Sequence, residues 1–144
     1  MSSIAEKFKL QSIQHARAGD SATELDILPT AGVRTISVVC QITTGHGTAM
    51  IMTLSTADDA AGTNTAVLTE NVPVYLNGVR QTDAKACTIP NTYNGLGLLK
   101  NFVVFEVPAN IIPTGKYLGI HLTAGGNSGN ILSAVAVEDT YYKG

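Results

Sequence analysis

Three histidines are the residues of this sequence best suited to bind a metal ion or to transfer protons: His15, His46 and His121. None of them has a second histidine, a cysteine or a carboxylate at the spacing that protein metal sites use. His46 falls in a glycine-rich turn, and His121 falls on the polar side of a predicted strand. We therefore expect these side chains to face solvent or a partner, and we expect no metal ion and no other cofactor.

Two pairs of adjacent acidic residues, Asp58-Asp59 and Glu138-Asp139, are the candidates for catalytic carboxylates. Neighbouring side chains along a strand point to opposite faces, so neither pair forms a dyad by its spacing. In a loop, Asp58 and Asp59 could offer oxygen ligands to Ca²⁺, but the Asp-x-Asp-x-Asp-Gly pattern of such loops is absent. The acidic residues therefore predict neither acid–base catalysis nor a calcium site.

Glycine and serine patterns also fail to predict an active site. Gly95-Leu96-Gly97 is not followed by a third glycine and does not open a predicted helix, so it does not match a nucleotide-binding loop. The sequence has no Gly-x-Ser-x-Gly motif, which would expose a nucleophilic serine on a tight turn. No nucleophile, base and oxyanion donor come together, and we expect that the protein is not an enzyme.

Tyrosine is the more informative residue, because all five tyrosines fall at predicted strand ends or in loops. A tyrosine offers a broad apolar ring and one hydroxyl, and it is enriched where proteins meet. The same rings would also cap the ends of a β-sandwich, and the sequence favours neither role. We expect a partner to bind at an irregular segment and at the C-terminal tail. The predicted partner-binding residues are Tyr93, Leu96, Leu98, Leu99, Tyr141 and Tyr142.

The composition is that of a weakly charged chain. Of the 144 residues, 14% are charged, against about 25% in an average soluble protein. This composition suits a protein that rests on another protein, and equally a compact β domain with a neutral surface. The net charge is −2, and no lysine or arginine cluster is present. We therefore expect no nucleic-acid partner, since that would need a basic patch.

The sequence also predicts where the protein resides. Its opening, MSSIAEKFKL, lacks the apolar core of a signal peptide. No apolar run approaches the roughly 20 residues that cross a bilayer as a helix. We expect a protein made and kept in a cytosol, with no membrane partner. Two cysteines do not make a disulfide framework; a bridge between Cys40 and Cys87 is left open as the alternative to two free thiols.

Strand-like alternation is strongest between Arg34 and Asp59. Apolar residues recur there at every second position on both sides of a turn at residues 44–47, which is the period of a half-buried strand. Glycine supplies the positive φ angles that a tight turn needs. We predict a β-hairpin whose apolar face packs on further sheet. Its alternating apolar residues are Ile36, Val38, Cys40, Ile42, Met50, Met52 and Leu54.

Further strands are predicted on both sides of this hairpin. Asn77-Gly78 is the strongest turn signal in the chain. Pro73 restricts the strand predicted at 67–76 to a sheet edge or a bulge, because proline has no amide hydrogen to donate. Residues 1–6 are read as an N-terminal arm and residues 79–100 as a long irregular loop, a kind of segment that is often functional. The remaining strands are expected near 7–15, 23–27, 67–76, 101–107, 118–122 and 131–137, the last alternating through Ile131, Ser133, Val135 and Val137.

About eight short strands without a convincing helix predict an all-β fold, either a sandwich or a barrel. A single jelly-roll-like β-sandwich over residues 1–144 is the first choice, because eight strands with long connections suit two facing sheets. An immunoglobulin-like sandwich is the alternative. The chain has no tryptophan and no suitably placed cysteine pair to support that second fold.

Three stretches of the chain carry a resemblance to a known family: KFKLQSIQHARAGDSATELDIL, VVCQITTGHGTAMIMTLSTADD and GKYLGIHLTAGGNSGNILSAVAVED. A strand ending in Thr-x-Gly leads to one that closes on Leu-x-Thr-x-Asp-Asp. Later, a Tyr-Leu-x-Ile strand passes through a glycine turn to a last strand rich in valine and alanine. This order resembles the small capsid cement, or decoration, proteins of tailed bacteriophages, in particular the Bbp16-like family.

The resemblance implies a structural virion protein made in the host cytoplasm. Such a protein would bind the outer surface of a phage head and stabilise contacts between capsomers. Its partners would be the major capsid protein and further copies of itself, in a homo-dimer or homo-trimer. The irregular loop, the N-terminal arm and the tail would then make the contacts.

Two other functions fit the same composition. A carbohydrate-binding β-sandwich would use exposed aromatic rings against sugars, although the chain has no tryptophan. Another phage structural part, such as a head–tail connector or a tail-tube subunit, would also be small and rich in strands. Rings of six or more copies would indicate a connector or a tube, whereas dimers or trimers would indicate a cement protein.

Overall fold

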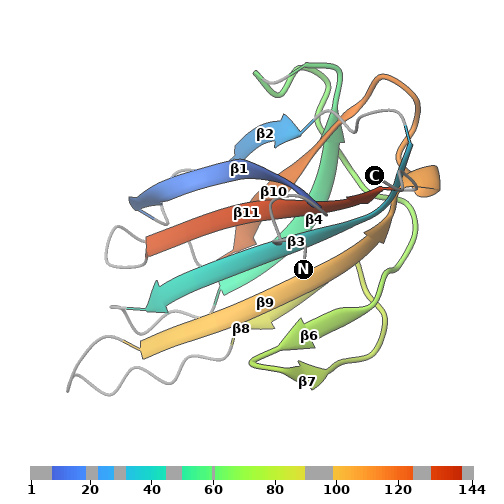
Figure 1. Cartoon of the computed structure of the whole chain (residues 1–144). Helices are drawn as coiled ribbons and strands as arrows, with labels where there is room; N and C mark the ends of the chain where they lie inside the picture. The colour runs from blue at the N-terminus through green and yellow to red at the C-terminus, as the bar shows by residue number, and fades with distance from the viewer. Residues whose placement is uncertain are drawn as a thin grey trace.

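The computed structural model describes residues 8–18, 23–27, 32–44, 50–59, 61–89, 99–124 and 131–140, and the side chains of 32–43, 50–59, 61–89, 100–120 and 133–139. These residues form two antiparallel β-sheets that lie face to face, with the larger sheet toward the viewer in Figure 1. The all-β sandwich predicted from the sequence is confirmed. Apart from one short 3₁₀ turn, η1 (Ala109–Ile111), no helix occurs among the described residues.

The larger sheet has six strands in the order β1-β11-β3-β9-β6-β7. Its strands are β1 (Phe8–Ala18), β11 (Ile131–Thr140), β3 (Val33–Thr44), β9 (Leu99–Pro108), β6 (Val74–Leu76) and β7 (Val79–Arg80). The smaller sheet has the order β2-β10-β4-β5, and β8 also pairs with β4. Its strands are β2 (Thr23–Ile27), β10 (Tyr117–Ala124), β4 (Met50–Ala57), β5 (Ala66–Val67) and β8 (Ala86–Ile89).

The predicted hairpin between Arg34 and Asp59 is wrong, because its two strands belong to different sheets. β3 pairs with β11 on one side and β9 on the other, whereas β4 pairs with β10, β5 and β8. A hairpin would turn both apolar faces to the same side of one sheet. Placing the strands in opposite sheets makes those faces meet, so that each removes the other from water.

The core lies between these two faces. All seven alternating apolar residues of β3 and β4 are fully buried, from Ile36 to Leu54. On β9, the inward residues Val103, Phe105 and Val107 are also fully buried, as the alternation of that segment predicts. Pro108 ends the strand, as expected. Cys40 and Cys87 are both buried in this core and neither forms a disulfide, so the alternative of a bridge does not hold.

The last strand turns the opposite face inward from the one that the sequence predicts. Ala134 and Ala136 of β11 are buried, together with Glu138, while Val135 is 36% exposed. β11 lies between β1 and β3 inside the sheet. Small alanine side chains therefore face the core at this position, and the larger valines are left on the outside.

The segment 79–100 is not one irregular loop. β7 and β8 lie within it, and β9 begins at its end, which leaves residues 90–98 outside the described residues. The Asn77-Gly78 turn is confirmed: both residues have positive φ, 50° and 81°, and they join β6 to β7. Two strands predicted near the start of the chain are also found, as β1 and β2, while the predicted arm at 1–6 lies outside the described residues.

Candidate interaction surface

A row of apolar side chains crosses the outer face of the larger sheet. The sheet register aligns one residue from each of four neighbouring strands, β11, β3, β9 and β6. Each lies between two inward residues that are buried in the core or, in the case of Leu76 beside Tyr75, packed against it, so its own side chain points away from the core. We call this set the outer row: Val135, Val39, Val104 and Tyr75.

Phe102 extends the outer row along β9. It is two residues from Val104, so both side chains lie on the same face of the strand. Its side chain is 46% exposed. Antiparallel sheets that face water usually carry polar residues on that side. A row of valines with a half-exposed phenylalanine beside it is therefore a candidate binding surface.

The turn between β6 and β7 fixes the position of Phe102. The Asn77 side-chain oxygen accepts a hydrogen bond from the Phe102 amide at 2.9 Å, and the Asn77 amide donates to the Phe102 carbonyl at 2.8 Å. The Asn77 side-chain amide also donates to Asn101 Oδ1 at 3.0 Å. These contacts tie the hairpin to β9, so the backbone under Phe102 is held in place before any partner binds.

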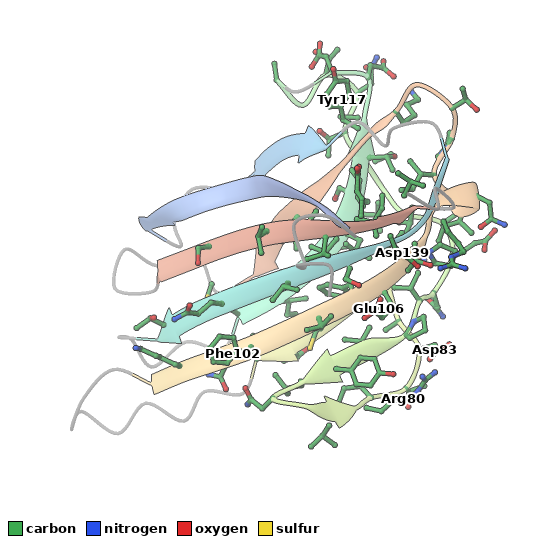
Figure 2. The ribbon with its side chains drawn as sticks, in the orientation of Figure 1. Arg80, Asp83, Phe102, Glu106, Tyr117 and Asp139 are labelled. Carbon is green, nitrogen blue, oxygen red and sulfur yellow. The ribbon has the colours of Figure 1, made fainter. Side chains whose placement is uncertain are left out.

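Ion pairs within the chain lie toward the margins of this face. At the β6–β7 edge, Arg80 forms an ion pair with Asp83 at 2.8 Å, and both residues are labelled in Figure 2. The Arg80 guanidinium also lies over the Tyr75 ring, 5.8 Å from its centre, and donates to the Tyr75 hydroxyl at 3.3 Å. That hydrogen bond, with the nearby Asp83 charge, raises the pKa of Arg80. The positive charge of Arg80 therefore lies against Tyr75, the residue at this end of the outer row.

At the far end of β3, Arg34 forms an ion pair with Asp139 of β11 at 2.6 Å. Between these margins, Ser37 of β3 donates a hydrogen bond to Glu106 Oε2 of β9 at 2.7 Å. Figure 2 shows Phe102 and Glu106 spaced along β9 and Asp139 near the end of β11. The outer row therefore crosses a face that also carries polar side chains, such as Gln41 and Ser133, and the described acidic groups of this face are held by neighbours.

The residues predicted to bind a partner are not among the described side chains of this surface. Leu99 is the first residue of β9, where it pairs with Thr44 of β3, and its side chain lies outside the described part. The other five predicted residues, Tyr93, Leu96, Leu98, Tyr141 and Tyr142, also lie outside the described residues. Their predicted role stays a prediction.

The acidic pair in the loop after β4 is occupied by contacts within the chain. Asp58 accepts hydrogen bonds from Lys116 and, at 2.6 Å, from Asn64. Asp59 accepts the Thr63 hydroxyl at 2.6 Å and the Thr63 amide at 3.0 Å. The hydrogen bond from Lys116 lowers the pKa of Asp58, and the one from the Thr63 hydroxyl lowers the pKa of Asp59. Both carboxylates therefore act to fix the loop.

The described residues offer little for chemistry elsewhere. They contain no group of three or more histidine, cysteine or acidic side chains placed to hold a metal ion. Burial raises the pKa of both the Cys40 and the Cys87 thiol, which disfavours the reactive thiolate. In the same part of the chain, no helix is long and apolar enough to cross a membrane.

No protein-family model, no curated protein and no solved structure matches this chain.

Proposed function

We propose that this protein is a structural binding protein, a capsid cement protein that binds the outer surface of a tailed-phage head and stabilises contacts between its capsomers. The observation that carries the proposal is the outer row with Phe102 beside it, on the outer face of the larger sheet. The phage assignment draws its support from the resemblance of the three sequence stretches. The partner would be the major capsid protein, and the location would be the surface of the virion.

The order of the strands supports the finer proposal of a jelly-roll topology. When the three shortest strands are set aside, the larger sheet reads β1-β11-β3-β9 and the smaller β2-β10-β4-β8. The strands near the two ends of the chain are thus neighbours in both sheets. Wrapping a long antiparallel pair around a core in this way is the plan of a jelly roll. Such a fold supports many functions, so the functional proposal depends on the surface.

The expected mechanism is thermodynamic linkage. A protein that binds only the assembled shell stabilises that shell by RT ln(1 + [L]/Kd), about 2.7 kcal/mol per site at a hundredfold excess over Kd. An oligomer that contacts several capsomers gains further, because its second contact forms at a high effective concentration. Apolar contact suits this role, since burying a valine or phenylalanine needs no charge on the shell.

The test is co-sedimentation of the purified protein with expanded heads assembled from the major capsid protein encoded by the same phage. A Val104→Lys variant places a charge in the middle of the outer row, and binding should weaken at least tenfold, about 1.4 kcal/mol. Val79→Lys is the matched control, because Val79 is 64% exposed on β7 and lies outside the row. Heads that bind neither wild type nor control would overturn the proposal.

One observation favours a second candidate, a carbohydrate-binding module. Tyr75 and Phe102 both belong to the candidate surface and come from neighbouring strands, and aromatic rings of this kind can stack on sugars. A glycan array decides between the two: strong binding that Tyr75→Ala removes would favour the module. A connector or tail-tube subunit is separated by mass, because it would assemble into rings of six or more copies.

A further inference from the structure

Two charged side chains on the outer face of the larger sheet have no opposite charge bound to them in the described part of the chain. Lys100 and Glu106 both belong to β9, at the even-numbered positions that face away from the core. Lys100 is exposed, and no hydrogen bond or ion pair to it is found there. Glu106 accepts a neutral donor, the Ser37 hydroxyl. The arginines at the margins, by contrast, are already paired with aspartates.

These two charges are placed symmetrically. Each lies three residues from Val103 along β9, and the outer-face residues between them are Phe102 and Val104. Consider two copies whose outer faces meet, with their β9 strands antiparallel and crossing at Val103. A two-fold axis then places Lys100 of each copy opposite Glu106 of the other. The same rotation places Phe102 of each copy opposite Val104 of the other.

We propose that the occupant of the outer face is a second copy of this chain, packed in this antiparallel arrangement. The inference rests on the proposed function to the extent that both treat this face as a protein-binding surface. A two-fold interface uses one patch twice, so the patch must complement itself. Two Lys100–Glu106 pairs would flank a central contact of Phe102 against Val104, and opposite charges would also fix the register between the copies.

The area of the face fits a stable dimer. Its four long strands have 10 to 12 residues each. At about 4.8 Å between strands and 3.3 Å per residue, they cover on the order of 600 Å² in plan. Side chains make the accessible area larger than the plan, which approaches the roughly 800 Å² per partner of a specific interface. Sheets that pack face to face lie about 10 Å apart, a gap that lysine and glutamate side chains can bridge.

The dimer would also change how the protein meets its shell. The dimer would cover the same outer face that the proposed function gives to the shell, so a second copy and a phage head would compete for that face. A chain in the dimer could bind a head through its outer row only after the two copies separate, and heads in excess should therefore dissociate the dimer. Self-association is therefore measured without heads, and binding to heads is measured with heads in excess.

The test uses charge reversal and sedimentation of the full-length chain. Lys100→Glu puts two acidic groups opposite each other at both ends of the interface, and Glu106→Lys puts two basic groups there. Each single variant should dimerise at least tenfold more weakly than wild type. An equimolar mixture of the two single variants restores both opposite-charge pairs and should dimerise again, as should the double variant. Lys85→Glu and Glu70→Lys are the matched controls, because these charges lie outside the larger sheet.

The expected mass is about 30 kDa for wild type and for the mixture, twice the 15.0 kDa of one chain, and about 15 kDa for each single variant. Unchanged thermal unfolding would show that the variants fold. A wild type that stays monomeric at all concentrations overturns the inference, and so does a dimer that both single variants leave intact. A chain that binds heads but stays monomeric without them would overturn the dimer and leave the proposed function standing; a dimer that binds no heads at any concentration would do the reverse.

Discussion

Val39 of β3 and Val104 of β9 lie directly opposite each other in the register of the larger sheet, on the face turned away from the core. Their chain neighbours on both sides are buried. The same two strands thus build the core with one face and contribute two valines of the outer row with the other. The account of function depends on this second face.

Two phenylalanines of β9 lie on opposite faces of the larger sheet, so a substitution of each one tests a different face. Phe105 is fully buried, whereas Phe102 is 46% exposed on the opposite side of the same strand. Phe105→Ala should reduce the free energy of unfolding by about 3–5 kcal/mol, because it empties a core position. Phe102→Ala should cost less than about 1 kcal/mol, since this residue is about half exposed and its removal empties no core position.

Urea unfolding of both variants provides the measurement, with binding to heads and self-association measured alongside. The prediction is a large loss of stability for one variant and a large loss of binding for the other. Equal losses of stability in the two variants would mean that Phe102 is a core residue and that the outer face is misassigned.

The loop after β4 should lose its support in acid. The hydrogen bonds to Asp58 and Asp59 lower both pKa values below the ordinary value of 3.8. A lowered pKa in the folded state contributes stability that is present above pH 3.8 and is lost as the pH falls through the folded pKa. Between pH 6 and 5 these groups stay ionised, and stability should not change on their account.

Thermal midpoints measured from pH 6 to pH 2.5 test this expectation. Asp58→Asn removes one titrating group, so its midpoint should fall less steeply than that of wild type below pH 4. Lys116→Met removes the first cause of the Asp58 shift and should flatten the profile as well. Profiles of the same slope for all three proteins would show that this loop does not contribute to acid stability.

The two thiols should resist modification in the native protein. Cys40 is fully buried and Cys87 is 6% exposed, and burial raises both pKa values above the ordinary 9.0. Because the thiolate is the reactive form, an alkylating reagent at pH 8 should label the folded chain slowly or not at all. In denaturant, both cysteines should be labelled. Rapid labelling without denaturant would contradict the buried position of these thiols.

The strands could be predicted from the sequence because their alternation is local. Ile36, Val38, Cys40 and Ile42 repeat every second residue, and a half-buried strand is the structure with that period. The turn at Asn77-Gly78 was also predicted, since only residues tolerant of positive φ suit it.

The partners of each strand could not be predicted in the same way. The alternation of β3 and β4 fits both a hairpin and two strands in opposite sheets. It shows which side of each strand is apolar, but it does not show which other strands each one pairs with. β3 is paired on both sides by β9 and β11, strands far from it in the sequence. Those long-range pairs decide the fold.

The candidate surface was missed for a related reason. Val39 stands among Thr35, Ser37 and Gln41 on a face that reads as polar when β3 is taken alone. It joins Val104 and Val135 only when three strands lie side by side in register. The sequence signal was one valine at the outward position of each of these three strands. It indicates a shared apolar row only when the order of the strands in the sheet is known.

Hydroxyl-radical footprinting of Phe102 tests the central claim most directly, since the oxidation rate of a side chain reports its exposure to water. The rate is measured for the dilute chain, for the chain at high concentration and for the chain with heads, and Val79 serves as the exposed reference. The account predicts that Phe102 becomes several-fold protected in at least one of the two bound conditions while Val79 does not. A Phe102 oxidised at the same rate in all three conditions would contradict the account.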